Sequence, residues 1–151
     1  MKLKSLVFLF ASIPALACPN LAGSYKVCHS TPGQDQDASQ VTVEQKIMNQ
    51  MMVYEVTSLD PQTGDLRSDI YEADGKLRET VLTDPDNGTV IKTQTTAICE
   101  KENLKVKMNI TIDSKPLAKM TIQLSKTNAQ LIQIFKGESM GEPVNYITSC
   151  E

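Results

Sequence analysis

The chain has no tryptophan and one histidine, and aromatic residues occupy only 5% of its 151 positions. One histidine cannot supply the two that an H-E-x-x-H zinc site needs, and the chain has no G-x-S-x-G elbow or phosphate-binding loop. His29 directly follows Cys28, and neighbours on a strand point to opposite faces, which prevents a thiol and base pair. We therefore expect no enzyme, no catalytic residue and no cofactor, and keep an activity of unfamiliar type as a third alternative.

Three longer patterns are also missing. The basic residues are scattered singly and form no stripe with interleaved aromatics, so we expect no nucleic-acid partner. No stretch approaches the ~20 apolar residues that a transmembrane helix requires, so we expect no membrane span. No segment holds apolar residues at helical spacing over ten or more positions, which argues against helices.

Residues 1–17 have the pattern of a secretory signal peptide. Lys2 and Lys4 precede an apolar run from Leu6 to Ile13, and Ala15 and Ala17 place small residues at the cleavage site. Cleavage leaves residues 18–151 as one domain of about average length. Loss of the two lysines lowers Lys+Arg from 15 to 13 against 18 acidic residues, a net charge of -5. We expect a secreted or periplasmic protein.

Cys18 would be the first residue after cleavage, which raises the alternative of a lipoprotein anchored through that cysteine. The mature chain holds four cysteines, Cys18, Cys28, Cys99 and Cys150, and an even number in an exported protein indicates disulfides. Acylation of Cys18 would leave an odd thiol. The separations lack the short C-x-x-C spacing of metal sites, so we expect no metal.

Alternation of apolar and polar residues predicts an all-β fold, an antiparallel up-and-down meander of eight to ten strands. The expected strands are Leu21–His29, Gln40–Met48, Met51–Leu59, Leu66–Glu72, Lys76–Thr83, Thr89–Cys99, Leu104–Asp113, Leu117–Ser125, Gln130–Lys136 and Val144–Cys150. Such strands can remain an open sheet or fold into a sandwich, but we expect a closed or nearly closed barrel, because closure removes the unpaired sheet edges.

Most connections carry turn signals. The loops that begin at Asp60 and Asp84 share the pattern D-P-x-x-G, in which Pro and Gly favour a hairpin turn. A calcium site at Asp84 is disfavoured because Thr89 and Thr95 occupy the positions where an EF-hand has Gly and Glu. Two connections look longer, Ser30 to Ser39 and Gly137 to Pro143. Such loops can carry binding residues, although their composition favours plain solvated loops.

The stretch Leu21-Ala22-Gly23-Ser24-Tyr25 resembles the first strand of the calycin barrels, the lipocalins and fatty-acid-binding proteins. Those proteins begin with an apolar residue, a glycine and then an aromatic, and continue as a meander. The resemblance implies a barrel whose interior takes a small apolar ligand, with Tyr25 at the closed end. The start C-P-x-L-x-G-x-Y also resembles small bacterial exported proteins, which implies no particular function.

If the barrel holds a ligand, five side chains are candidates to line its interior: Tyr25, Met48, Met52, Met108 and Met120. Methionine adapts its shape to acyl chains, although packing of an ordinary core explains the same residues. The expected function is thus binding of a small apolar or lipidic ligand. The alternative is a protein-interaction module, such as an inhibitor or an accessory factor for another envelope protein.

Strand directions in the meander give an expectation for disulfide pairing. Alternating strands place Cys18, Cys99 and Cys150 at one end, and Cys28 at the other if Leu21–His29 is straight. A disulfide tolerates only ~4.4 to 6.8 Å between Cα atoms, so the chain must bend near Pro19 and Gly23. We expect Cys18 to pair with Cys28, and Cys99 with Cys150.

Overall fold

The structure is a computed structural model that describes residues 18–31, 40–60 and 63–151. The predicted signal peptide and most of the loop predicted from Ser30 to Ser39 lie outside the described residues. Eleven strands and no helix occur in the described part of the chain, and every strand pair is antiparallel. The all-β, antiparallel prediction is confirmed.

The strands form two sheets. The small sheet has the order β1–β3–β4–β5, comprising β1 (Gly23–Tyr25), β3 (Gln40–Met48), β4 (Met51–Leu59) and β5 (Leu66–Glu72). The large sheet has the order β2–β11–β10–β9–β8–β7–β6, comprising β2 (Cys28–Thr31), β6 (Asp74–Thr83), β7 (Val90–Glu100), β8 (Asn103–Ile112), β9 (Lys115–Thr127), β10 (Gln130–Ser139) and β11 (Glu142–Cys150).

Two bends carry the chain from one sheet to the other. The strand predicted over Leu21–His29 breaks at Lys26 and Val27, whose amides both donate to the carbonyl oxygen of Glu151, so β1 pairs with β3 while β2 pairs with β11. At Ala73 the chain passes from β5, which pairs with β4 in the small sheet, to β6, which pairs with β7 in the large sheet. The first break adds an eleventh strand to the predicted eight to ten.

The hydrogen-bonded ladders end at both bends. The result is two sheets that meet at two corners, and the prediction of a closed barrel is not confirmed. The order of strands is nevertheless that of a meander, because each strand from β3 to β11 pairs with its sequence neighbour except across the β5–β6 bend. Because the ladders end at the bends, the strands of the small sheet can run in a different direction from those of the large sheet.

Tight turns join most of the strands. Asn49 and Gln50, Asn128 and Ala129, and Met140 and Gly141 form two-residue turns with positive φ at both positions, the geometry that suits antiparallel hairpins. The prediction of a long loop from Gly137 to Pro143 is therefore wrong. Pro143 lies in β11 beyond the part that pairs with β2, and a sheet edge tolerates a residue without an N–H group.

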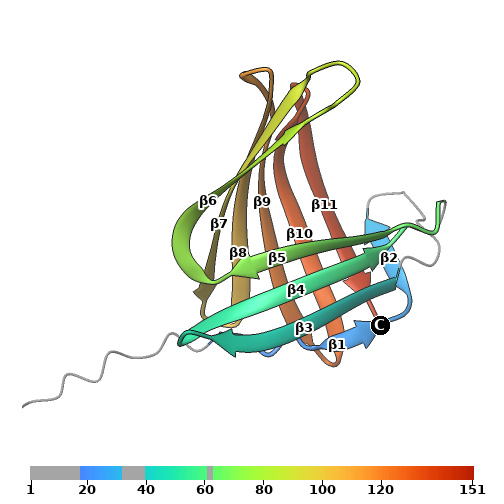
Figure 1. The fold of residues 1–151 in the computed structure, drawn as a ribbon. Helices are drawn as coiled ribbons and strands as arrows, with labels where there is room; N and C mark the ends of the chain where they lie inside the picture. The colour runs from blue at the N-terminus through green and yellow to red at the C-terminus, as the bar shows by residue number, and fades with distance from the viewer. Residues whose placement is uncertain (1–17, 32–39, 61–62) are drawn as a thin grey trace, which may run out of the picture.

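The small sheet covers only part of the large one, because its strands run across the long strands near one end (Figure 1). Four strands at ~4.8 Å spacing are about 19 Å wide, which matches about six residues along a strand at ~3.3 Å each. The strands β6 to β10 contain ten to thirteen residues. Several residues of each must therefore extend beyond the small sheet.

The core lies in the covered part, between the two sheets. Tyr54 from the small sheet and Leu104, Leu124 and Leu131 from the large sheet are at most 1% exposed. Along β8, Leu104, Val106 and Met108 are buried while Ile110 and Ile112, on the same face, are only partly covered. Burial therefore stops where the small sheet stops.

Candidate functional site

Two disulfides close one end of the molecule, which we call the near end. Cys18 is bonded to Cys99 and Cys28 to Cys150, so the predicted pairing is wrong although all four cysteines are bridged. The reason is the break at Lys26 and Val27, which turns the chain so that Cys28 lies directly opposite Cys150 across β2 and β11. A straight first strand would have carried Cys28 to the other end.

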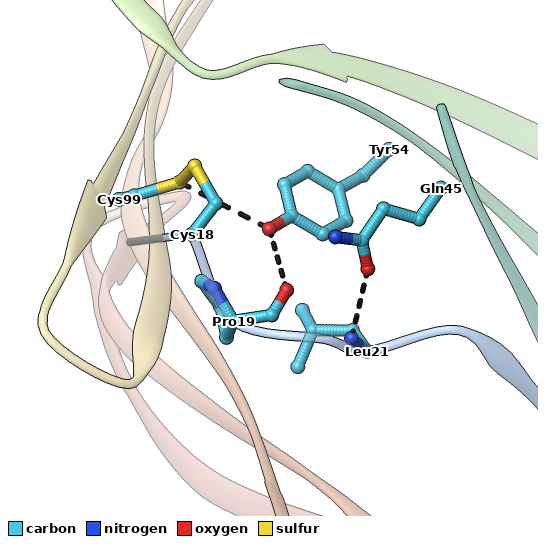
Figure 2. Close-up of a disulfide and its surroundings, with 6 residues drawn as sticks. All are labelled: Cys18, Pro19, Leu21, Gln45, Tyr54 and Cys99. Atoms are coloured by element: carbon cyan, nitrogen blue, oxygen red, sulfur yellow. Dashed lines mark hydrogen bonds between the residues drawn. A yellow bond between two sulfur atoms is a disulfide. The ribbon is translucent and has the colours of Figure 1, made fainter. Parts of the chain in front are cut away.

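The segment from Cys18 to Leu21 seals the near end (Figure 2). The hydroxyl of Tyr54 donates to the carbonyl oxygen of Pro19 at 2.7 Å, and the amide of Leu21 donates to Oε1 of Gln45 at 3.0 Å. The side chain of Leu21 is fully buried. A disulfide, two hydrogen bonds and an apolar anchor thus hold this segment against both sheets.

Tyr25 completes the seal. Its ring is 2% exposed, its hydroxyl donates to the carbonyl oxygen of Leu21 at 2.9 Å, and Nζ of Lys126 lies 5.7 Å from the ring centroid while donating to the carbonyl oxygen of Ala22. Tyr25 therefore packs in the core and helps to close the near end. The near end offers no access to a ligand.

Burial also changes the acidity of two neighbouring tyrosines. Removal from water raises the pKa of Tyr54 to about 12. Removal from water, together with the negative charge of Asp69, raises the pKa of Tyr71 as well. Both phenols are neutral at physiological pH, and their role at the near end and in the core is that of hydrogen-bonding and packing groups.

The opposite end of the large sheet, which we call the far end, presents an apolar surface that the small sheet leaves uncovered. We call this surface the open face, and it comprises Leu82 of β6, Ile91 of β7, Ile110 and Ile112 of β8, Met120 of β9, Phe135 of β10, and Val144 and Tyr146 of β11. These side chains share the face of the core residues on the same strands. Leu82 is 62% and Tyr146 36% exposed.

Charge is distributed unequally between the two sides of these strands. On the outer side, Nζ of Lys92 lies 2.7 Å from Glu79, which also accepts from Gln94, and these contacts lower the pKa of Glu79. On the inner side of β6 to β11, the residues between Arg78 and the hairpin turns of the far end are uncharged. The polar residues there include Thr80 and Thr93, beside Ile110, and charged residues return only at the turns, with Lys115 and Glu142. A sheet side that faced only water would be expected to carry more polar and charged residues.

The residues predicted to line an interior fall into three groups. Met108 is buried, and it lies directly opposite Met120, which is partly exposed at the start of the open face. Met52 is partly buried against the core. Met48 is 47% exposed beside the β3–β4 turn, so it lies outside the interior.

The open face also contains an aromatic pair. The rings of Phe135 and Tyr146 stack with centroids 4.4 Å apart and an interplanar angle of 15°. They come from directly paired positions of β10 and β11. Partial burial raises the pKa of the Tyr146 hydroxyl. This stacked pair forms a flat part of the open face, next to the more flexible side chain of Met120 on the neighbouring strand.

An ion cluster holds the corner where the open face begins. The guanidinium of Arg78 on β6 bonds both oxygens of Asp74, at 2.7 and 3.0 Å, and also Glu72 of β5. The hydrogen bonds from Arg78 hold the pKa of Asp74 well below its usual range. The two carboxylates satisfy the charge of Arg78, so this residue offers no free cation to a ligand.

The apolar alternation of β8 continues without a break from the buried Leu104 and Val106 to the partly covered Ile110 and Ile112. Their alternation is the same as that of buried residues, so pattern alone does not separate the two sets. Strand length does distinguish them. The strands β7 to β10 contain ten or more residues, against a usual five or six, while β3 to β5 contain seven to nine.

Other candidate sites are poorer. A shallow hollow on the outer side is lined by Glu100, Lys101 and Lys105, of which Lys105 and Glu100 already form an ion pair. Within residues 18–31, 40–60 and 63–151, no three His, Cys, Asp or Glu side chains gather as a metal site. No helix capable of crossing a membrane occurs in the same residues.

Comparisons with protein-family models, curated proteins and solved structures find no match for this chain.

Proposed function

We propose that the protein is an exported binding module that holds a small apolar or lipidic ligand against the open face. The observation that carries the proposal is the uncovered, uncharged inner side of strands whose outer side is charged. Six strands at ~4.8 Å and four to five residues at ~3.3 Å give an area of roughly 29 by 15 Å. Apolar patches of this size, a few hundred Å², are commonly functional in soluble proteins.

The boundary between the core and the open face is the best place for a ligand to enter. Met108 and Met120 face each other there, and Phe135 packs against the core from the neighbouring strand. Methionine side chains are flexible and polarisable, so they can rearrange around a chain-like ligand without loss of contact. An acyl chain could then lie along the strands toward the far end.

The charges around the open face favour a ligand whose bound part is neutral. Arg78 is neutralised by Asp74 and Glu72, and the remaining lysines of the far end project from the outer side or the tips. An anionic headgroup would find no free cation among the residues of the open face, and the first lysine on that side is Lys115, opposite Ile112 at the hairpin tip. A headgroup should therefore lie at the hairpin tips, in contact with water.

Two disulfides support export, because such bonds form and persist in oxidising compartments. The sulfur of Cys18 is bonded to Cys99, and a sulfur in a disulfide cannot simultaneously carry a thioether-linked lipid. This favours a secreted or periplasmic protein over a lipoprotein anchored through Cys18.

The proposal can be tested by titration with a dansyl-labelled fatty acid, with native mass spectrometry of protein purified from its own host as a parallel measurement. Ile110→Asp places a charge on the open face. Asn109→Asp places the same group on the adjacent residue, which is exposed on the outer side. We expect Ile110→Asp to weaken binding by at least tenfold and Asn109→Asp to leave binding within twofold.

Circular dichroism must show that both variants keep the β fold. Absence of binding by the wild-type protein, or equal binding by the two folded variants, would contradict an apolar ligand on the open face. A retained protein in native mass spectrometry, without lipid, would favour the second candidate function, a protein-interaction module. The edge of β6 is the observation that favours it.

A further inference from the structure

The edge of β6 is less protected against strand addition than the other sheet edges. On the side away from β7, β6 has no partner strand among the described residues. Its pairing with β7 is regular from Leu77 to Thr83, after an irregularity between Asp74 and Leu77. An exposed, regular edge presents a row of unpaired N–H and C=O groups that can accept another strand.

The other three edges carry the usual safeguards. β1 and β2 contain only three and four residues, and the part of β3 that extends beyond β1 carries the charged residues Glu44 and Lys46. The part of β11 that extends beyond β2 begins with Glu142 and Pro143, and proline cannot donate to a ladder. On the edge of β5, Arg67 keeps a 74% exposed side chain within its ion pair with Asp69, whereas Arg78 of β6 is 34% exposed. Short strands, proline and charges are the devices that prevent strand addition.

The side chains of β6 lack comparable charges in free form. Residues 77–83 contain no lysine or proline, Arg78 is bonded to two carboxylates, and Glu79 is bonded to Lys92 and Gln94. The apolar residues are instead exposed: Leu77 by 63%, Val81 by 54% and Leu82 by 62%. Leu82 lies on the open face, so a strand added here would extend that face by one strand.

We propose that the edge of β6 from Leu77 to Thr83 is a strand-addition site for an extended segment of another protein. Seven residues at ~3.4 Å give an edge about 24 Å long and one strand wide. This strip is much smaller than the ~800 Å² per partner that stable globular complexes bury, so it fits a single extended segment better than a second folded copy. Main-chain hydrogen bonds supply affinity in this mode of recognition.

The charges next to the edge define the segment further. Asp84 and Asp86 follow Thr83 in the β6–β7 loop, at the far end of the molecule (Figure 1). A second copy of this acidic chain would bring the same charges, whereas a basic residue would complement them. The segment should therefore alternate β-branched and polar residues and carry basic residues at the end that lies beside Asp84 and Asp86.

A synthetic nine-residue peptide tests the site, with two lysines followed by alternating valine and threonine. Fluorescence anisotropy measures its binding to the full mature protein, and hydrogen exchange locates it. We expect saturable binding and slower exchange of the β6 amides between Leu77 and Thr83. Replacing the two lysines by glutamates should weaken binding several-fold at low salt, with a smaller difference at high salt.

Two controls separate strand addition from adhesion to exposed apolar side chains. Peptides N-methylated at alternate residues, in either phase, keep their side chains but lose one set of donors, and one of the two should fail to bind. Val81→Lys installs the lysine that natural edges use and should weaken binding at least tenfold. Ile147→Lys, at a similarly exposed position inside the β2–β11–β10 ladders, should leave binding within twofold.

The proposal is overturned if the wild-type protein does not bind the peptide, if both N-methylated peptides bind as well as the parent, or if exchange slows elsewhere but not in β6. Analytical ultracentrifugation gives a further decisive result. Self-association that Val81→Lys abolishes would assign the edge to a second copy and refute the proposed partner. The ligand proposal for the open face is tested separately, by the effect of Ile110→Asp on fatty-acid binding, so either proposal can fail without the other.

Discussion

The hydroxyl of Tyr54, in the middle of the small sheet, donates a hydrogen bond to the carbonyl oxygen of Pro19, 35 residues earlier in the chain. This bond lies beside the Cys18–Cys99 disulfide and fixes the N-terminal segment between the two sheets (Figure 2). The near end is thus closed by covalent and polar contacts, while the far end is left apolar and open. That asymmetry is the basis of the proposed direction of ligand entry.

Tyr54→Phe should destabilise the protein and flatten its alkaline stability profile. Loss of the hydrogen bond to Pro19 costs about 1 to 3 kcal/mol at pH 7 if the carbonyl stays unsatisfied. The pKa of Tyr54 is about 12 in the folded state and ~10 when unfolded, so its contribution is complete below pH 10 and declines as the pH rises toward 12. Urea denaturation from pH 8 to 12 should show a shallower decline in the free energy of unfolding for the variant. Tyr71 is present in both proteins, so its own contribution to the alkaline decline does not affect the comparison.

Non-reducing peptide mapping should find Cys18 joined to Cys99 and Cys28 joined to Cys150, which lie 81 and 122 residues apart. Replacing either pair with alanine should cost about 2 to 5 kcal/mol. The chain-entropy model predicts only about 0.4 kcal/mol between the two, because the dependence on loop length is logarithmic. A peptide that joins Cys18 to Cys28 would contradict the structure.

The strand boundaries were largely predictable because alternation and turn residues are local properties. The strands Gln40–Met48, Met51–Leu59 and Leu66–Glu72 were predicted to the residue. Asp60 and Asp84 both accept a hydrogen bond from the glycine four residues later, as expected from their shared D-P-x-x-G pattern. Local chemistry is sufficient for these features.

The corners were not predictable in the same way. The bend expected near Pro19 and Gly23 lies instead at Lys26 and Val27, because it depends on the carbonyl oxygen of Glu151, more than 120 residues away. This single error led to the wrong disulfide pairing. The open face was also missed, since whether Ile110 and Ile112 are covered depends on the width of the small sheet and the direction in which it crosses the long strands.

Arg78→Met should lower stability at pH 7 and reduce the protein's sensitivity to acid. The pKa of Asp74 is held below its usual range chiefly by its hydrogen bonds to Arg78, so the cluster stabilises the folded state above about pH 4 and loses this contribution as the pH falls further. Without Arg78 that acid-dependent loss should largely disappear. Urea midpoints between pH 2 and 7 provide the measurement.

Lys46→Met is the matched control for Arg78→Met, because it removes an exposed ion pair in which Nζ of Lys46 is 3.9 Å from Glu55. Such pairs contribute little, so its acid profile should follow that of the wild type. Parallel acid profiles for Arg78→Met and the wild type would contradict a stabilising role for the corner cluster.

Gly137→Ala, on β10 opposite the open-face residue Met120, should be strongly destabilising. Gly137 has φ +155°, and a Cβ atom there would lie 2.1 Å from the carbonyl oxygen of Lys119 on β9. Backbone strain of about 1 to 3 kcal/mol would add to a similar cost of displacing β9, so we expect a loss of roughly 3 kcal/mol or more.

Gly141→Ala is the control, because Gly141 also has positive φ, +81°, but its added methyl group meets no atom within 4 Å. The control should lose only about 1 to 2 kcal/mol. Equal urea midpoints for the two variants would show that β9 and β10 can separate at Gly137, and the open face would then be less rigid than the paired strands indicate.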